Sequence, residues 1–108
     1  MTFDEFQEKS KRTMSDALSF DMALCNYAMG LAGEAAGEVN DYIKKVVFHG
    51  HELDKGKLAE EMGDCLFYLA ALATTVGLSL TDVAKMNVTK LLARYPNGFD
   101  PERSINRG

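Results

Sequence analysis

Proline is absent from the first 95 residues of this 108-residue chain, and no other feature constrains the fold as strongly. Proline removes a backbone donor and ends helices, so a chain without it can form long uninterrupted helices. The two prolines, Pro96 and Pro101, both lie near the carboxyl end. No segment shows the alternating apolar and polar residues of a half-buried strand. The sequence therefore predicts an all-α fold.

Capping residues and apolar spacing predict four helices. Residues 2–5 and 79–82 both have the form of a capping box at the start of a helix. Asp54 can cap a further helix, and Gly77 can end it. The dipeptide Tyr95-Pro96 ends the last helix. We expect the helices to run to about residue 15, over about 22–48, over about 55–76 and from about 80 to Arg94.

Composition and charge indicate a small cytoplasmic protein that binds neither nucleic acid nor a membrane. Residues 1–108 suffice for one domain. The net charge of −4 argues against nonspecific nucleic-acid binding, which requires a basic surface. The amino-terminal stretch does not resemble a signal peptide, and no apolar run approaches about 18 residues. Cys25 and Cys65 fall within predicted helices, where we expect small buried thiols in a reducing compartment.

The third predicted helix is apolar on nearly all sides over residues 65–73. A helix of this kind is covered all round in the folded protein. A chain of 108 residues has few other elements with which to cover it. We therefore expect a homodimer, or a homotetramer built from dimers. The alternative is a central helix that its own chain wraps.

Four carboxylates occur in two short helical segments, Glu34 and Glu38 in one and Glu61 and Asp64 in the other. Residues three or four positions apart share a helix face, so each pair points to one side. In an antiparallel hairpin with facing apolar stripes, both pairs converge on one cleft. Clustered carboxylates repel unless a cation joins them, and Mg²⁺ prefers oxygen ligands. The alternative is a solvated charged face.

Glycines flank these acids inside the predicted helices. Each interior glycine costs about 0.5–1 kcal/mol relative to alanine in a helix. We therefore expect close helix approach, or room for a ligand, at Gly33, Gly37 and Gly63.

Three segments carry a family resemblance: GLAGEAAGEVNDYIKK, KLAEEMGDCLFYLAAL and NVTKLLARYPNGF. Over about residues 27–100 the chain resembles the MazG-like nucleotide pyrophosphohydrolases of the all-α nucleoside triphosphate pyrophosphatase superfamily. The resemblance implies a four-helix-bundle-like domain of MazG type that assembles as a dimer or tetramer. Residues 101–108 then form a flexible tail. The first acidic element departs from the usual GEAGE form by one additional residue between Glu34 and Glu38, whereas the second element matches directly.

The resemblance implies hydrolysis of a nucleoside triphosphate to the monophosphate and pyrophosphate. In that reaction Glu34, Glu38, Glu61 and Asp64 bind Mg²⁺, or Mn²⁺ in its place, and a metal-activated water attacks the α-phosphorus. By position, Glu34 or Glu38 is the candidate general base. The alternatives are a noncatalytic helical module for dimerisation or nucleotide sensing, and a phosphoribosyl-ATP pyrophosphohydrolase.

The fourth predicted helix carries candidate substrate contacts. Asn87, Lys90 and Arg94 are spaced three and four residues apart, so they share one polar face. The resemblance implies that Asn87 and Lys90 reach the nucleotide.

Three residues on the other helices are further candidates. Lys45 and Lys57 can contact phosphate, although lysines near acids commonly form surface ion pairs instead. Tyr68 can stack on the sugar or base, and its alternative role is core packing.

Overall fold

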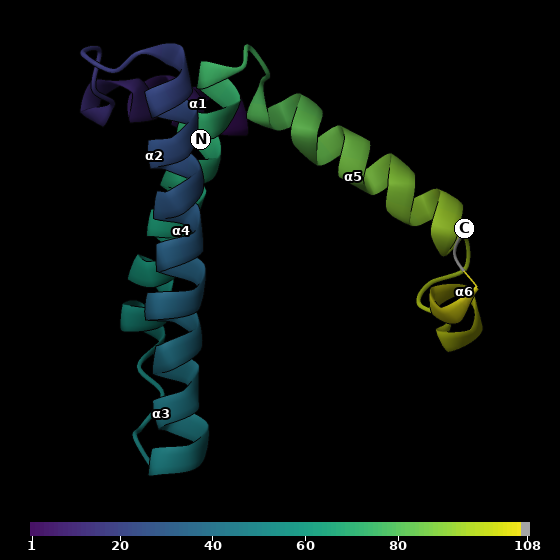
Figure 1. The fold of residues 1–108 in the computed structure, drawn as a ribbon. Helices are drawn as coiled ribbons and strands as arrows, with labels where there is room; N and C mark the ends of the chain where they lie inside the picture. The colour runs from purple at the N-terminus through teal and green to yellow at the C-terminus, as the bar shows by residue number, and fades with distance from the viewer. Residues whose placement is uncertain (107–108) are drawn as a thin grey trace.

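The computed structural model describes residues 1–106, which form helices and no strand (Figure 1). This result confirms the predicted all-α fold. The elements are α1 (Phe3–Ser10), the 3-10 turn η1 (Lys11–Thr13), α2 (Phe20–Ala32), the π-helical segment η2 (Gly33–Asn40), α3 (Asp41–His49), α4 (Lys55–Thr75), α5 (Leu80–Arg94) and α6 (Pro101–Ile105).

A helical hairpin forms the body of the molecule. One rod consists of α2, η2 and α3 in succession, and α4 returns antiparallel beside it (Figure 1). Gly50, at φ 70°, ends α3 in the left-handed conformation that glycine adopts without penalty. Asp54 begins α4 by accepting hydrogen bonds from two backbone N–H groups. Both rods agree with the predicted boundaries to within two residues.

Small side chains line the contact between the two rods. Ala23 and Ala71 surround the buried ring of Tyr27, and Met14, Leu18, Phe67, Tyr68 and Leu72 pack against this group. The distance between packed helices depends on the size of the side chains at the contact. Alanines at this contact therefore allow the rods to approach closely.

Helix α1 packs across the connection between α4 and α5, and Gln7 ties the two helices together. Its Nε2 donates to Thr74 Oγ1 at 3.0 Å and to the Leu78 carbonyl at 2.8 Å. Its Oε1 accepts from the Leu80 backbone N–H at 2.8 Å. Since Gln7 is only 8% exposed, these hydrogen bonds are largely shielded from water.

Helix α5 leaves the hairpin at an angle of 103° to α4 and extends away from it (Figure 1). Leu80 at its start is buried, whereas every residue from 85 to 93 is exposed. The radius of gyration is 16.7 Å, whereas a compact domain of about 100 residues has about 13 Å. The described part of one chain is a hairpin with a projecting arm, and it does not close the expected four-helix bundle.

The carboxyl-terminal segment begins with a helix where we predict a flexible tail. Asp100 accepts a hydrogen bond from the Glu102 backbone N–H at 3.0 Å, and Pro101 occupies the first helical position. Both features favour the start of a helix, which explains α6. The remainder of the predicted tail, residues 107–108, lies outside the described residues.

Many apolar side chains stay exposed. No large side chain among the described residues is fully buried, and Met62 and Leu69 on α4 are 57% and 41% exposed. The chain therefore does not wrap its own central helix. Both cysteines are free, but Cys25 is exposed, so the prediction of a buried thiol is wrong for Cys25 in the single chain.

No individual helix in residues 1–106 has both the length and the apolar composition needed to cross a membrane. Helices α4 and α5 pass that test only when they are taken as a pair. The 103° bend separates them.

Replacing Gln7 tests its contribution to the fold. Gln7→Ala leaves the Leu80 N–H and the Leu78 carbonyl without their partner, so the free energy of unfolding should fall by about 2–3 kcal/mol. Urea unfolding measures this loss. Lys11→Ala is the control, because it breaks an exposed ion pair worth about 0.5 kcal/mol. Equal losses of unfolding free energy in the two variants would contradict the role of Gln7 in joining α1 to the connection between α4 and α5.

Candidate metal centre

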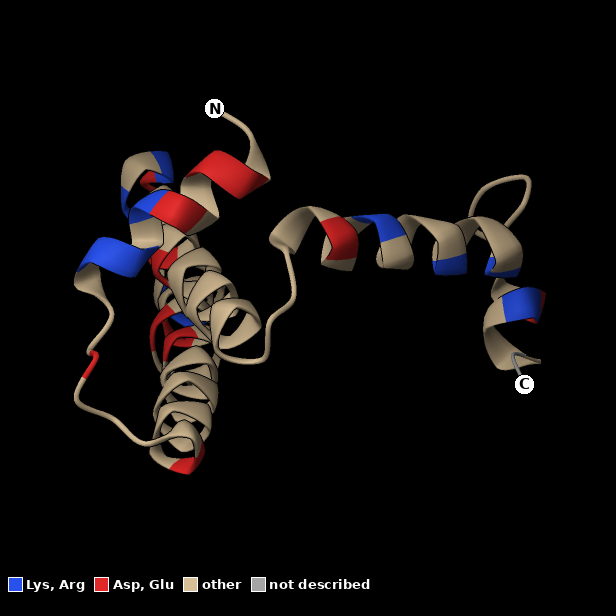
Figure 2. Cartoon of the chain, turned by 90° about the horizontal axis from the view of Figure 1, so that it is seen from above, with Lys and Arg blue, Asp and Glu red and all other residues tan. Residues whose placement is uncertain are grey.

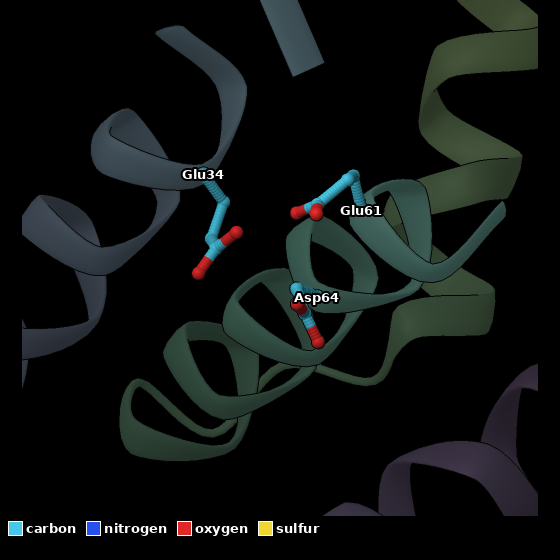
Figure 3. Close-up of side chains that lie close together, drawn as sticks. All are labelled: Glu34, Glu61 and Asp64. Carbon is cyan, nitrogen blue, oxygen red and sulfur yellow. The ribbon is translucent and has the colours of Figure 1, made fainter. Parts of the chain in front are cut away.

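The hairpin brings three carboxylates together, Glu34 from η2 and Glu61 and Asp64 from α4 (Figure 3). One oxygen from each side chain lies within 4.8 Å of the other two. Glu34 and Glu61 are half-buried, and Asp64 is exposed. The two α4 acids lie one turn apart and meet Glu34 across the hairpin. We call these three residues the acid cluster.

Glu34 has a perturbed pKa. Burial, followed by the charges of Asp64, Glu61 and Glu38, raises its pKa above the usual 4.5. Its Oε2 atom is shielded from solvent and has no hydrogen-bond partner among the described residues. The one ion pair found in residues 1–106 lies between α1 and η1, away from the acid cluster. A buried, unpartnered carboxylate oxygen beside two further carboxylates would be stabilised by a cation.

The donor set of the acid cluster fits a hard divalent cation. Carboxylate oxygens are the ligands that Mg²⁺ and Mn²⁺ prefer. Oxygens on opposite sides of one Mg²⁺ ion lie about 4 Å apart, because each Mg–O bond is about 2.0–2.1 Å. The three oxygens of the acid cluster lie within 4.8 Å of one another, so the side chains could hold one such ion after small movements. The exposed Asp64 leaves one side of the cluster accessible to water or substrate.

Glu38 lies outside the acid cluster. Its side chain is exposed, and its charge is the smallest of the four causes that raise the pKa of Glu34. Glu38 is therefore near the cluster without being one of its three convergent carboxylates. Metal binding by Glu38 stays a prediction.

Cys65 borders the acid cluster, but its thiol is not activated there. Burial, followed by the charges of Glu34, Asp64 and Glu61, raises the pKa of the Cys65 thiol. A protonated thiol is a weak nucleophile. The chemistry of this site therefore rests on its carboxylates.

Close packing against a glycine occurs at Gly30 and not at the three glycines beside the acids. A Cβ atom at Gly30 would overlap the ring of Tyr68. Tyr68 thus packs onto the α2 backbone, and its role in substrate binding stays a prediction. The three glycines beside the acids border open space, since an added Cβ would meet no atom within 4 Å at Gly33, Gly37 or Gly63. Within one chain, close helix approach is therefore not found at these positions, whereas the alternative expectation, room for a ligand, agrees with the open space.

The candidate substrate residues on α5 are distant from the acid cluster within one chain. Asn87 and Lys90 are exposed and Arg94 is half-buried, all on the arm that leaves the hairpin (Figure 1). Figure 2 shows acidic segments on the hairpin and α1, whereas the charged residues of α5 beyond its first turn are basic. One chain therefore separates its acid cluster from these cationic side chains.

A cavity of about 800 Å³ lies between the end of α5 and α6. Lys90 and Arg94 line this cavity together with Arg103. Arg103 is not among the residues predicted from the sequence to contact substrate, because residues 101–108 are expected to form a flexible tail. The signal for an ordered segment is Asp100-Pro101, which favours the start of a helix.

The two candidate phosphate-binding lysines on the hairpin, Lys45 and Lys57, lie outside the acid cluster. The Lys57 Nζ atom is 5.3 Å from the centre of the Tyr42 ring, an arrangement typical of a cation–π contact. The Tyr42 hydroxyl accepts from the Asp54 backbone N–H at 2.8 Å, which fixes this ring beside the loop between α3 and α4. Lys45 is exposed on α3. Phosphate binding by either lysine stays a prediction.

Comparison with known proteins identifies related sequences. Residues 24–99 match the MazG nucleotide pyrophosphohydrolase domain. The chain is 34% identical over 83 residues to the protein named "Gene 37 protein" of Mycobacterium phage L5, covering 73% of this chain and 72% of that protein. No solved structure matches the chain. The region matching the domain contains both acidic segments and α5.

The raised pKa of Glu34 predicts a pH-dependent stability. Just above pH 4.5 the folded chain binds a proton at Glu34 more readily than the unfolded chain does. The contribution of Glu34 to stability therefore falls as pH rises through this interval and stays unfavourable at neutral pH. With a chelator present, Glu34→Gln should melt above the wild type at neutral pH, and the difference should shrink toward pH 4.5.

Thermal unfolding at a series of pH values measures this effect. Glu60→Gln is the matched control, because Glu60 is an exposed acid on α4 beside Glu61. The Glu60 variant should follow the wild type at each pH. A Glu34→Gln protein that melts below the wild type at neutral pH would contradict the electrostatic interpretation.

Proposed function

Because the chain belongs to the MazG nucleotide pyrophosphohydrolase family, we propose that it hydrolyses a nucleoside triphosphate to the monophosphate and pyrophosphate. We propose that Mg²⁺, or Mn²⁺ in its place, assists this reaction. The observation that carries the proposal is the acid cluster, with three carboxylate oxygens within 4.8 Å of one another. The unpartnered Oε2 of Glu34 adds support, because it leaves a ligand position for a cation.

In this proposal Glu34, Glu61 and Asp64 hold the divalent cation, and Glu38 contacts it through a bound water. When bound, the cation neutralises polyphosphate charge and lowers the pKa of water. Glu38 is our candidate general base, because it lies beside the acid cluster without belonging to it. An uncommitted carboxylate can accept the proton of the attacking water.

The proposed reaction breaks the bond between the α-phosphorus and the oxygen that bridges it to the β-phosphorus. A water oxygen attacks the α-phosphorus in line, its proton passes to Glu38, and pyrophosphate leaves. Asn87 and Lys90 contact the nucleotide, and Arg94 extends the same polar face. Lys45 and Lys57 are secondary phosphate contacts, and Tyr68 is a stacking contact for the sugar or base.

A second copy of the chain is part of the proposal. We infer a homodimer, or a homotetramer of dimers, in which α5 packs against the hairpin of a neighbouring copy. Val88 and Leu91 share the face of α5 that begins at the buried Leu80, yet they are 55% and 44% exposed. Beside the acid cluster the hairpin has an apolar cavity of about 260 Å³, lined by Ala35, Val39, Met62, Cys65, Leu66 and Leu69. Burial of these surfaces favours association.

Two alternatives lead to different results in one assay. A noncatalytic module for dimerisation or nucleotide sensing binds nucleotides without producing pyrophosphate. A phosphoribosyl-ATP pyrophosphohydrolase releases pyrophosphate from that substrate and not from ordinary nucleotides. No feature of the described residues favours either alternative over the proposed activity.

Incubation with a panel of nucleoside triphosphates and Mg²⁺, followed by pyrophosphate detection, tests the proposed activity. Glu38→Gln should lower kcat by about 10²–10⁴-fold, the usual contribution of a general base, with little change in metal affinity. Glu61→Gln should instead weaken metal binding. Glu60→Gln should retain wild-type activity. A Glu38→Gln enzyme with unchanged kcat would remove Glu38 from this role.

Substitution on α5 tests the assembly. The double variant Val88→Lys with Leu91→Lys places two charges on the apolar face, so the molar mass in solution should fall to that of one chain, with loss of activity. Light scattering after size-exclusion chromatography measures the mass. Thr89→Lys, on the opposite face of α5, is the control and should keep the wild-type mass. A wild-type protein of single-chain mass would refute the proposed assembly.

A further inference from the structure

Along the α2–η2–α3 rod the less exposed residues recur at ordinary helical spacing, except beside the acid cluster, where one interval is longer. In the two turns before this point the less exposed side chains are Tyr27, Leu31 and Glu34, at ordinary helical spacing, and Gly30, which has no side chain, is also half-buried. The next less exposed residue is Val39, five positions after Glu34, because all residues of 35–38 are exposed. The ordinary spacing then resumes at Tyr42, Ile43 and Val46.

The longer interval exceeds the ordinary spacing by one residue. At about 100° per residue from Glu34, the inward residues up to Glu34 average about 30° on an α-helical wheel. The inward residues from Val39 onward average about 130° on the same wheel. The difference of about 100° is the rotation that one residue contributes.

A π-helical segment removes this excess rotation. Its hydrogen bonds join residues five apart, so each turn holds more residues than an α-helical turn. The π-helical segment η2 spans Gly33–Asn40, where the longer interval occurs. In an unbroken α-helix, the inward position after Glu34 would fall on Glu38 and then on Asp41. Those charged residues would then face α4, and Val39 would be turned away from it.

We propose that η2 absorbs one extra residue, so that both halves of the rod keep their register on α4 while Glu38 is turned out of the helix contact. Burial of the apolar residues that follow η2 favours this winding, because Tyr42 is only 8% exposed and accepts the Asp54 hydrogen bond. The acid spacing agrees with the proposal. Glu34 and Glu38 are four apart, whereas Glu61 and Asp64 on the facing helix are three apart.

The consequence for the site rests on the proposed function. The π turn keeps Glu34 in the acid cluster and leaves Glu38 at its border, where it is free to serve as a base. Ala35, Ala36 and Gly37 are then positioning residues, which act through the direction of Glu38.

Deletion of a single residue tests the proposal. Deleting Ala36 should convert η2 to ordinary α-helix and preserve both contacts with α4. The variant should therefore remain folded, with a Tm within about 5 °C of the wild type, a shift of about 1 kcal/mol. Deleting Ala28 is the matched control, because it also removes an exposed alanine from the same rod, but from α-helical α2. That deletion should unfold the protein or lower its Tm several times more.

Mn²⁺ binding, followed by electron paramagnetic resonance, gives a second readout. The Ala36 deletion should bind Mn²⁺ within about threefold of the wild-type affinity, since the acid cluster is retained. Two outcomes would overturn the proposal: equal destabilisation by the two deletions, or a folded Ala36 deletion that binds Mn²⁺ at least about tenfold more weakly. If the wild type itself binds no Mn²⁺, the proposed function fails, while the unfolding comparison still tests the winding of η2.

Discussion

The close packing of α2 against α4 is the interaction on which the rest of the structure depends. Ala23 and Ala71 around Tyr27 let the two rods approach, and this approach brings Glu34 to the acids of α4. Burial of Glu34 and, after it, repulsion by the neighbouring carboxylates oppose the packing, and both raise the pKa of Glu34. Apolar burial elsewhere along the hairpin outweighs the repulsion. The fold therefore holds negative charges in an arrangement that a cation would stabilise.

The direction of α5 determines where its basic side chains lie relative to the acid cluster. Gln7 connects α1 to both sides of the α4–α5 turn, so α5 leaves the hairpin in a defined direction. Beyond its first turn the arm has exposed apolar residues and basic side chains. Within one chain these groups do not meet the acid cluster. A nucleotide site that uses both sets of residues therefore needs a neighbouring copy, which is why the proposed activity and assembly are linked.

Local interactions explain how much of this structure can be predicted from sequence. Thr2, Asp54 and Ser79 each cap a helix by accepting hydrogen bonds from backbone N–H groups two or three residues ahead, so these boundaries can be read directly. The meeting of Glu34 with the α4 acids also follows from helical spacing in a hairpin. The direction of α5 cannot be predicted in this way, because Gln7 bonds residues more than 60 positions away. The π turn is hidden as well, since Ala35 lets the apolar pattern fit an unbroken α-helix.

The contact of Gly30 with Tyr68 has a consequence for how this sequence can change over time. Any side chain at position 30 would occupy the space of the aromatic ring, so a lineage that loses the glycine must also move this ring or replace it with a smaller residue. Conversely, a lineage with a small residue at position 68 no longer requires glycine on the facing helix. The two positions should therefore vary together among descendants of a common ancestor, although 38 residues separate them along the chain.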